Sequence, residues 1–131
     1  MKGSIAPPQD LVRQVFKLTN GKMADVVFEH VGPVLFEAAL KSLAFGGKLI
    51  TCGATSGPTT PLDLRYVFSR QLQILGAKMG SLSEMREVST LISQRKLKAV
   101  IDRVFNLKEA AKAHEHLAAQ NQFGKVILEI S

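Results

Sequence analysis

The order of apolar patterns along this 131-residue chain predicts an α/β protein built on a parallel sheet. Helix-like and strand-like segments alternate from one end of the chain to the other, an order that also favours right-handed crossovers. The run Val26–Phe28 has no polar alternation and is β-branched and aromatic. This is typical of a strand that a parallel sheet buries on both faces.

In the first half of the chain, proline and glycine residues indicate where the predicted elements begin and end. Pro8 opens a helix pattern that Asn20-Gly21 ends, and the strand around Val26–Phe28 comes next. A second helix pattern begins at Pro33, and Gly46-Gly47 are expected to end it as a left-handed cap. Residues 48–52 then predict the second strand.

The second half continues the alternation. The expected elements are a short helix over 61–68, a strand over 71–77, a helix over 82–95, a strand over 100–105, a helix over 106–117 and a strand over 125–130. Ser81 and Glu84 have the spacing of a capping box, in which each side chain binds a free amide at the helix start. We find no internal repeat, low-complexity tract or linker long enough to divide the chain. Residues 1–7 are interpreted as a flexible N-terminus or a cloning remnant.

Composition excludes several classes of protein. Apolar residues make up 46% of the chain, which excludes a disordered chain, and no apolar run reaches the roughly 18 residues of a membrane span. The single cysteine, Cys52, excludes an internal disulfide and a zinc site with several thiolates, and the reducing cytoplasm is the expected location. The net charge of +6 permits binding of nucleic acid or a phosphorylated ligand. The basic residues are scattered, however, which argues against nucleic acid.

Glycine follows each of three strand patterns, at Gly32, Gly53 and Gly80. In open α/β sheets, ligands bind outside the carboxyl ends of the strands, where glycine lets a ligand approach the backbone. A single glycine more often only ends a strand and turns the chain. Three at successive strand ends favour a ligand site.

The histidines and the cysteine leave alternatives open. His114 and His116 are two residues apart on one helix, so they point to different faces and are interpreted as solvated. His30 stands beside Glu29 at a strand end, as a hydrogen-bond donor, a titrating group or a polar lining residue. Cys52 forms a reactive pair with His30 only if the side chains converge, and a small buried cysteine is the commoner case.

No complete active site is visible as a motif. The chain lacks Gly-x-Gly-x-x-Gly, a Walker-type phosphate loop, Gly-x-Ser-x-Gly and His-Glu-x-x-His, and no paired carboxylates stand out. We therefore predict no catalytic residue and no metal ligand in this chain.

Three segments together resemble the medium-chain dehydrogenase/reductase superfamily, which includes zinc alcohol dehydrogenases and quinone oxidoreductases. They are Ala24–Gly32, Gly46–Gly57 and Gly124–Leu128, and the resemblance extends from Pro8 onward. It implies a partial Rossmann-like parallel sheet, the second half of a dinucleotide-binding domain, with helices on both faces. Residues 8–131 would hold this half followed by terminal helix and strand elements of the catalytic domain. The family's glycine-rich loop and most zinc ligands would lie upstream, so the chain is expected to be a fragment or a truncated gene product.

The resemblance also implies where NAD or NADP would bind. The implied contacts are His30, Val31 and Gly32 on the adenosine side, Cys52, Gly53 and Ala54 near the nicotinamide, Ala77, Lys78 and Met79 flanking it, and Lys125 near the pyrophosphate. A solvated lysine at the start of a strand is an equal alternative for Lys125.

A further implication concerns pairing between copies. The strand over 71–77 would be a sheet edge, and family members commonly pair two such edges into one continuous sheet. Without upstream strands, Val26–Phe28 would become a second, exposed apolar edge. The strands over 100–105 and 126–130 would pack into the missing domain or pair with each other.

The sequence leaves two main function classes open, and nucleic-acid binding is a third alternative. The first is the cofactor-binding C-terminal portion of an NAD(P)-dependent oxidoreductase whose parent transfers hydride to or from an alcohol, aldehyde or quinone-like substrate. The isolated chain would then be inactive or nearly so, because it lacks the glycine-rich helix start that holds the pyrophosphate. The alternative is a non-catalytic dimerising α/β interaction module. A nucleic-acid binder would show affinity that falls steeply with salt.

Overall fold

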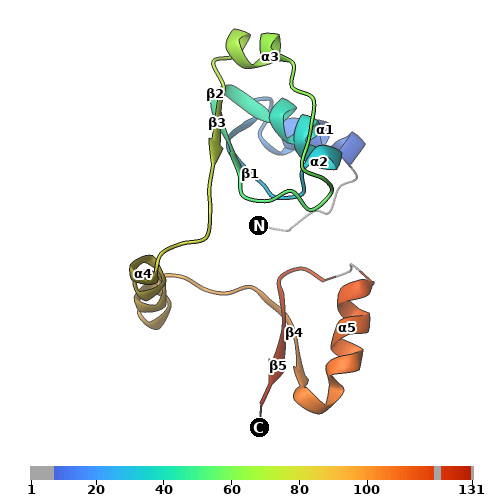
Figure 1. The fold of residues 1–131 in the computed structure, drawn as a ribbon, viewed down its shortest axis with the longest axis vertical. Coiled ribbons are helices and arrows are strands. Elements are labelled where there is room, and N and C mark those ends of the chain that lie inside the picture. The colour runs from blue at the N-terminus through green and yellow to red at the C-terminus, as the bar shows by residue number, and fades with distance from the viewer. Residues whose placement is uncertain (1–7, 120–121, 131) are drawn as a thin grey trace. The chain divides into compact units, whose positions relative to one another are not determined.

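The computed structural model describes residues 8–119 and 122–130, which form two compact units (Figure 1). The N-terminal unit comprises described residues 8–79, and the C-terminal unit comprises described residues 80–119 and 122–130. The boundary follows Met79, where the sequence has no long linker. Each unit is described by itself.

Parallel strands form the centre of the N-terminal unit. Its elements are α1 (Pro8–Leu18), β1 (Ala24–Glu29), α2 (Pro33–Lys41), β2 (Leu43–Thr51), α3 (Leu64–Ser69) and β3 (Gln73–Gly76). The three strands form one sheet in the order β1-β2-β3, and both pairs are parallel. The register aligns Val27 with Leu49 and Leu49 with Ile74.

The C-terminal unit is smaller. Its elements are α4 (Leu82–Ser93), β4 (Ile101–Asn106), the 3-10 turn η1 (Leu107–Glu109), α5 (Ala110–Ala118) and β5 (Lys125–Glu129). Strands β4 and β5 pair with each other in parallel, as one of the two alternatives predicted. The predicted α/β class with parallel strands is therefore confirmed. Among the described residues, no helix is both long and apolar enough to cross a membrane.

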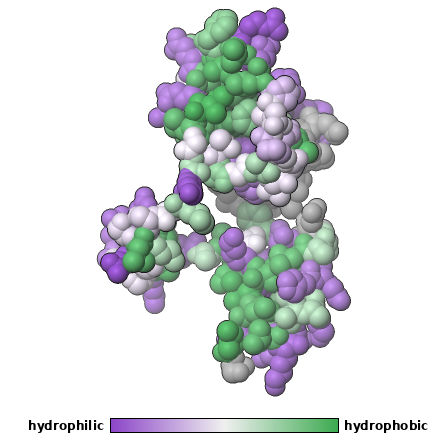
Figure 2. Space-filling model, in the orientation of Figure 1, coloured by the Kyte–Doolittle hydropathy of each residue, from purple (hydrophilic) through white to green (hydrophobic). Residues whose placement is uncertain are grey.

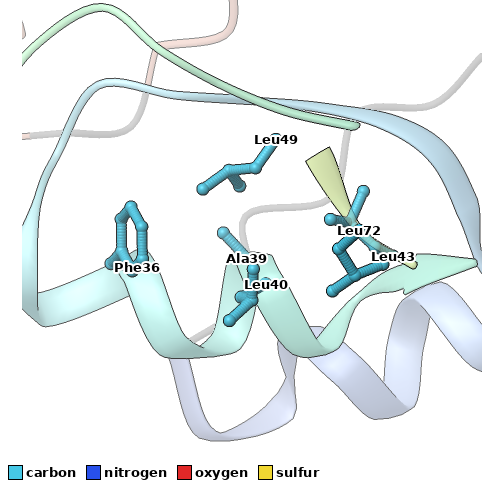
Figure 3. Packing of buried hydrophobic residues seen from close by; sticks show 6 residues of the cluster. All are labelled: Phe36, Ala39, Leu40, Leu43, Leu49 and Leu72. Carbon is cyan, nitrogen blue, oxygen red and sulfur yellow. The ribbon is translucent and has the colours of Figure 1, made fainter. Parts of the chain in front are cut away.

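Helix α2 supplies the core of the N-terminal unit. Phe36, Ala39 and Leu40 lie on one face because of their helical spacing, and all three are buried. Figure 3 shows Leu49 on the side of α2 toward which Phe36 and Ala39 extend, and Leu40, Leu43 and Leu72 complete the cluster. Fully burying one such leucine stabilises the fold by roughly 1.5–3 kcal/mol.

The opposite face of the sheet differs from the prediction for Val26–Phe28. Val27 packs against the core, but Phe28 is 72% exposed and Leu75 on β3 is 43% exposed. The expectation of burial on both faces is therefore wrong within the described residues. Helix α2 contacts β1 and β2, and these apolar side chains point away from its face because residues alternate along a strand. Both β1 and β3 are edges of the described sheet, as predicted.

Gly46 and Gly47 do not end the second helix. Helix α2 ends at Lys41, its C-cap Ser42 is right-handed, and β2 runs through both glycines. The β1–β2 register shifts between Ala24 and Val26, and beside this irregularity Gly46 adopts φ +72°. A Cβ at position 47 would lie 2.9 Å from the Ala44 carbonyl oxygen. The glycines serve an irregular strand rather than a helix cap.

Candidate functional site

The three strands of the N-terminal unit end level with one another. Glu29 on β1 aligns with Thr51 on β2, and Thr51 aligns with Gly76 on β3. The residues that follow continue this alignment, since the Cys52 amide donates to the Glu29 carbonyl at 3.0 Å and the Ala77 amide donates to the Thr51 carbonyl at 2.9 Å. Segments 30–32 and 52–54 therefore lie side by side, and Ala77 continues the alignment after β3. We call residues 30–32, 52–54 and 77–79, which follow the three strands, the strand-end surface.

Glu29 fixes the first segment of this surface. Its side chain turns back toward the start of α2, where Oε1 accepts the Val31 amide at 2.5 Å and the Gly32 amide at 2.7 Å. The Glu29 residue is only 2% exposed, and its second oxygen, Oε2, is buried without a hydrogen-bond partner among the described residues. Negative charge is favourable near a helix N-terminus, which is where this carboxylate lies.

The loop after β2 holds the same segment from the other side. The Ser56 hydroxyl donates to the Val31 carbonyl at 2.7 Å and accepts the Val34 amide at 3.2 Å. The Thr55 hydroxyl donates to the His30 carbonyl at 3.1 Å. Segment 30–32 is thus held by hydrogen bonds on two sides.

Two glycines of the surface are required by the packing of the chain itself. A Cβ at position 53 would lie 2.7 Å from the His30 carbonyl oxygen, so the first two segments approach too closely for a side chain. Gly32 is buried at φ +92°, where a Cβ would lie 3.1 Å from the Gly57 carbonyl oxygen. Their glycine identity is explained without a ligand. Gly80 begins the C-terminal unit, so it is not a member of this surface.

The remaining members are mostly open to solvent. His30, Cys52, Ala54, Ala77 and Lys78 are exposed, and Met79 is 89% exposed. The described residues show no hydrogen bond between Cys52 and His30, and the Cys52 thiol instead lies 3.9 Å from the Glu29 carbonyl oxygen. The geometry gives the cysteine no basic partner, and the commoner alternative of a buried cysteine is wrong because Cys52 is exposed.

His116 differs from its interpretation as a solvated residue. Its Nε2 lies 2.7 Å from Asp102 Oδ2, and the two side chains are 19% and 22% exposed. This hydrogen bond lowers the pKa of the Asp102 carboxyl, and a hydrogen bond from the Phe123 amide has a smaller effect in the same direction. The pair joins α5 to β4. His114 is exposed, as predicted.

Lys125 lies outside the N-terminal unit. It is the first residue of β5, it is exposed, and its amide donates to the Val100 carbonyl at 2.8 Å. Its placement near a pyrophosphate stays a prediction. In the described part of the chain, no three His, Cys, Asp or Glu side chains gather as metal ligands would.

A separate cavity of about 300 Å³ lies between α2 and residues 60–66. Phe36, Leu40 and Tyr66 contribute apolar walls, and the exposed Glu37–Lys41 ion pair stands beside them. None of the predicted cofactor contacts lines this cavity.

Sequence reasoning missed the two residues that shape the first segment, Glu29 and Ser56. The sequence did contain a signal for Glu29. A helix is expected to start at Gly32-Pro33, and a carboxylate at position 29 can accept the backbone amides two and three residues later, those of Val31 and Gly32. No comparable signal marks Ser56, since its contact with Val34 crosses 22 residues of sequence.

Residues 7–128 match a protein family described as zinc-binding dehydrogenase. A quinone oxidoreductase of Pseudomonas aeruginosa is 31% identical over 129 residues, which cover 92% of this chain and 40% of that protein. A crotonyl-CoA reductase of Streptomyces collinus is 30% identical over 114 residues, which cover 87% of this chain and 26% of that protein. The chain therefore spans less than half the length of these relatives.

Solved structures give the same picture. A crystal structure of an NAD-dependent alcohol dehydrogenase is 37% identical with a TM-score of 0.72, covering 92% of this chain and 35% of that one. A 2-octenoyl-CoA carboxylase reductase, solved in complex with NADP and 2-octenoyl-CoA, is 29% identical with a TM-score of 0.73. That match covers 92% of this chain and 28% of that one.

Proposed function

Since the chain belongs to the zinc-binding dehydrogenase family, we propose that it is the cofactor-binding C-terminal portion of an NAD(P)-dependent oxidoreductase of the alcohol dehydrogenase or quinone reductase type. The observation that carries this proposal is the strand-end surface, where three parallel strands end level. In open α/β sheets this is the edge at which ligands bind. The relatives are oxidoreductases by name, and their names and titles include both NAD and NADP.

Each segment of the surface has a proposed role. His30 and Val31 would contact the adenosine side of the cofactor, with Gly32 buried behind them as part of their turn. Residues 52–54 would lie along the nicotinamide, and residues 77–79 would flank it. The bound nicotinamide supplies the hydride chemistry, and this chain's residues bind and orient it.

The described residues do not provide a zinc site, so we assign this chain no step through a metal. The chain also lacks a glycine-rich phosphate loop, which would hold the pyrophosphate at a helix start. We therefore expect weak cofactor binding without turnover. Hydride transfer to an alcohol, aldehyde or quinone-like substrate belongs to the whole parent enzyme, and a cytoplasmic location stays a prediction.

Titration of the chain with NADH and NADPH, followed by cofactor fluorescence, tests the proposal. The chain has no tryptophan, so no indole signal interferes. We expect saturable binding with a Kd between about 1 μM and 1 mM. Ala77→Arg places a bulky side chain at the exposed residue that follows β3, and it should raise the Kd at least about tenfold, equivalent to about 1.4 kcal/mol. Gln73→Arg is the matched control, because it places the same side chain on an exposed position at the other end of β3.

Absence of binding at millimolar cofactor would contradict the proposal for this chain. An equal effect of both arginine variants would place binding elsewhere. Absence of binding together with a stable dimer would favour the non-catalytic interaction module, and salt-dependent binding of nucleic acid would favour the basic binder.

We also propose that two copies pair through the β3 edge. Leu75 is 43% exposed on this strand, and an unpaired edge offers free backbone groups. Leu75→Lys should shift the mass measured by light scattering from dimer to monomer. Phe28→Lys makes the same kind of change on the β1 edge, so dissociation by that variant alone would move the interface to β1.

A further inference from the structure

We infer that Glu29 is a positioning residue, whose buried carboxylate sets the conformation of segment 30–32 at the strand-end surface. The inference about conformation stands on the geometry alone. Its consequence for cofactor binding rests on the proposed function.

The carboxylate holds two consecutive amides with one oxygen. Oε1 accepts from the Val31 amide at 2.5 Å and from the Gly32 amide at 2.7 Å, which closes a turn between the end of β1 and the start of α2. Charge-assisted bonds of this kind are stronger than those between neutral groups. Gly32 has φ +92° and follows directly in that turn, so the carboxylate stabilises a conformation that few sequences adopt unaided.

The main chain of the same residue fixes the second segment. The Glu29 carbonyl accepts the Cys52 amide at 3.0 Å, and the Cys52 thiol lies 3.9 Å from the same oxygen. One residue therefore contacts both segment 30–32, through its side chain, and segment 52–54, through its backbone. A change in its conformation would move two of the three segments together.

Burial of this carboxylate is expensive in isolation. Oε2 has no hydrogen-bond partner among the described residues, although the residue is only 2% exposed. Burying a polar atom without a partner costs stability, so an apolar side chain would serve better if this position only filled the core. The Val31 and Gly32 amides donate to Glu29, and the Val34 amide donates to Ser56. These three amides are therefore not free to donate to a ligand. Segment 30–32 therefore meets a ligand through its side chains and carbonyl groups.

The test compares Glu29→Ala with Glu29→Gln in the full chain. Glutamine keeps a carbonyl oxygen that can accept both amides, whereas alanine removes the acceptor. Hydrogen exchange measured by NMR should show the Val31 and Gly32 amides exchanging at least about tenfold faster in Glu29→Ala, relative to the Leu49 amide. Glu29→Gln should stay within about threefold of the unmodified chain. The Kd for NADH should rise at least about tenfold in Glu29→Ala and be restored by Glu29→Gln.

Val27→Ala is the matched control for a general loss of stability. It lies on the same strand and the same face, and it packs against the core of the N-terminal unit. It should lower the Tm and leave the Kd for NADH within about twofold.

Unchanged protection of Val31 and Gly32 in Glu29→Ala would overturn the inference, and so would an equal rise in Kd with Val27→Ala. If the unmodified chain shows no saturable NADH binding, the proposed function fails for this chain. The exchange rates of the two amides then still decide whether Glu29 positions the segment.

Discussion

The two units are built from the same kinds of elements, yet only the N-terminal unit buries a substantial core. Six hydrophobic side chains are buried there, from α2, from β2 and from Leu72, which directly precedes β3. Within the described residues of the C-terminal unit, Ala113 is the single buried hydrophobic residue. Strands β4 and β5 instead expose Ile101, Val104 and Leu128, at 54%, 51% and 36%. Figure 2 shows hydrophobic residues at the surface of this unit.

Two physical differences explain the contrast. In the N-terminal unit, β2 has a strand on each side, whereas β4 and β5 are both edges of a two-stranded sheet. Helix α2 also brings Phe36 and Leu40 to its sheet, while the buried residue of α5 is a single alanine. A third strand and bulky helix residues are what let a small parallel sheet exclude water. Among the described residues, the C-terminal unit therefore leaves more of its apolar strand residues exposed.

Truncating a leucine in each unit should give the largest contrast. Leu49 is fully buried in β2, and Leu49→Ala should lower the free energy of unfolding by about 2–5 kcal/mol, because it removes apolar contacts and leaves a cavity. Leu128→Ala makes the same change on the exposed β5 and should cost about 1 kcal/mol or less. Tyr66, the only tyrosine, reports unfolding of the N-terminal unit in urea.

Hydrogen exchange of the β4 and β5 amides measures the effect of Leu128→Ala in its own unit. Equal losses for the two variants would break the comparison, since Leu128 would then be as well packed as Leu49.

The sequence was sufficient to predict the alternation of elements in both units. Local signals explain this success: proline starts α1 and α2, Asn20 and Gly21 both have positive φ after α1, and the capping box precedes α4. The sequence was not sufficient to predict which strand residues are buried. Phe28 has the apolar character of a doubly buried strand, but its exposure depends on which elements cover the sheet, and that is not a local property.

The start of α4 offers a smaller test within the weakly packed unit. The Ser81 hydroxyl accepts the Glu84 amide, and the Glu84 carboxylate accepts the Ser81 amide, which lowers the pKa of Glu84. Ser81→Ala should destabilise the helix by about 1 kcal/mol, because a free amide loses its partner. The pKa of Glu84, followed by NMR, should rise toward its ordinary value as the Ser81 hydroxyl is lost.

Ser89→Ala is the control for this change, since it substitutes a serine within α4 whose hydroxyl bonds only to the Met85 carbonyl. Alanine favours helix there, so amide exchange in α4 should not accelerate. A loss in Ser89→Ala equal to that in Ser81→Ala would mean that the helix depends on serine content rather than on its cap.

The candidate site was predictable in position but not in its internal contacts. Strand-end residues such as His30, Cys52 and Ala77 could be placed together because parallel strands end at one edge. Glycine was a weaker guide, since Gly53 is required by the nearby His30 carbonyl. The contact between Ser56 and Val34 depends on the path of a loop, so no local pattern predicts it.

Lowering the pH should produce the smallest of these changes in stability, and the change should occur in the C-terminal unit. The bond to His116, followed by the Phe123 amide, lowers the pKa of Asp102 below its ordinary value of 3.8. As pH falls, the unfolded chain therefore takes up this proton before the folded chain does. The stabilisation is complete above about pH 3.8 and is lost as pH falls through the lower, folded value. Exchange of the Val104 amide should report this loss as the pH falls below about 3.8.

Asp102→Asn removes the titrating group and keeps an oxygen that can accept the Phe123 amide. In this variant, the β4 amides should be less protected from hydrogen exchange near neutral pH than in the unmodified chain. Their protection should also change less as the pH falls, because no proton is then taken up at position 102. If the β2 amides lost protection in parallel with β4, the transition would be a global acid unfolding. Loss confined to β4 and β5 would assign the pH response to the Asp102–His116 pair, and would show that the two units respond separately to acid.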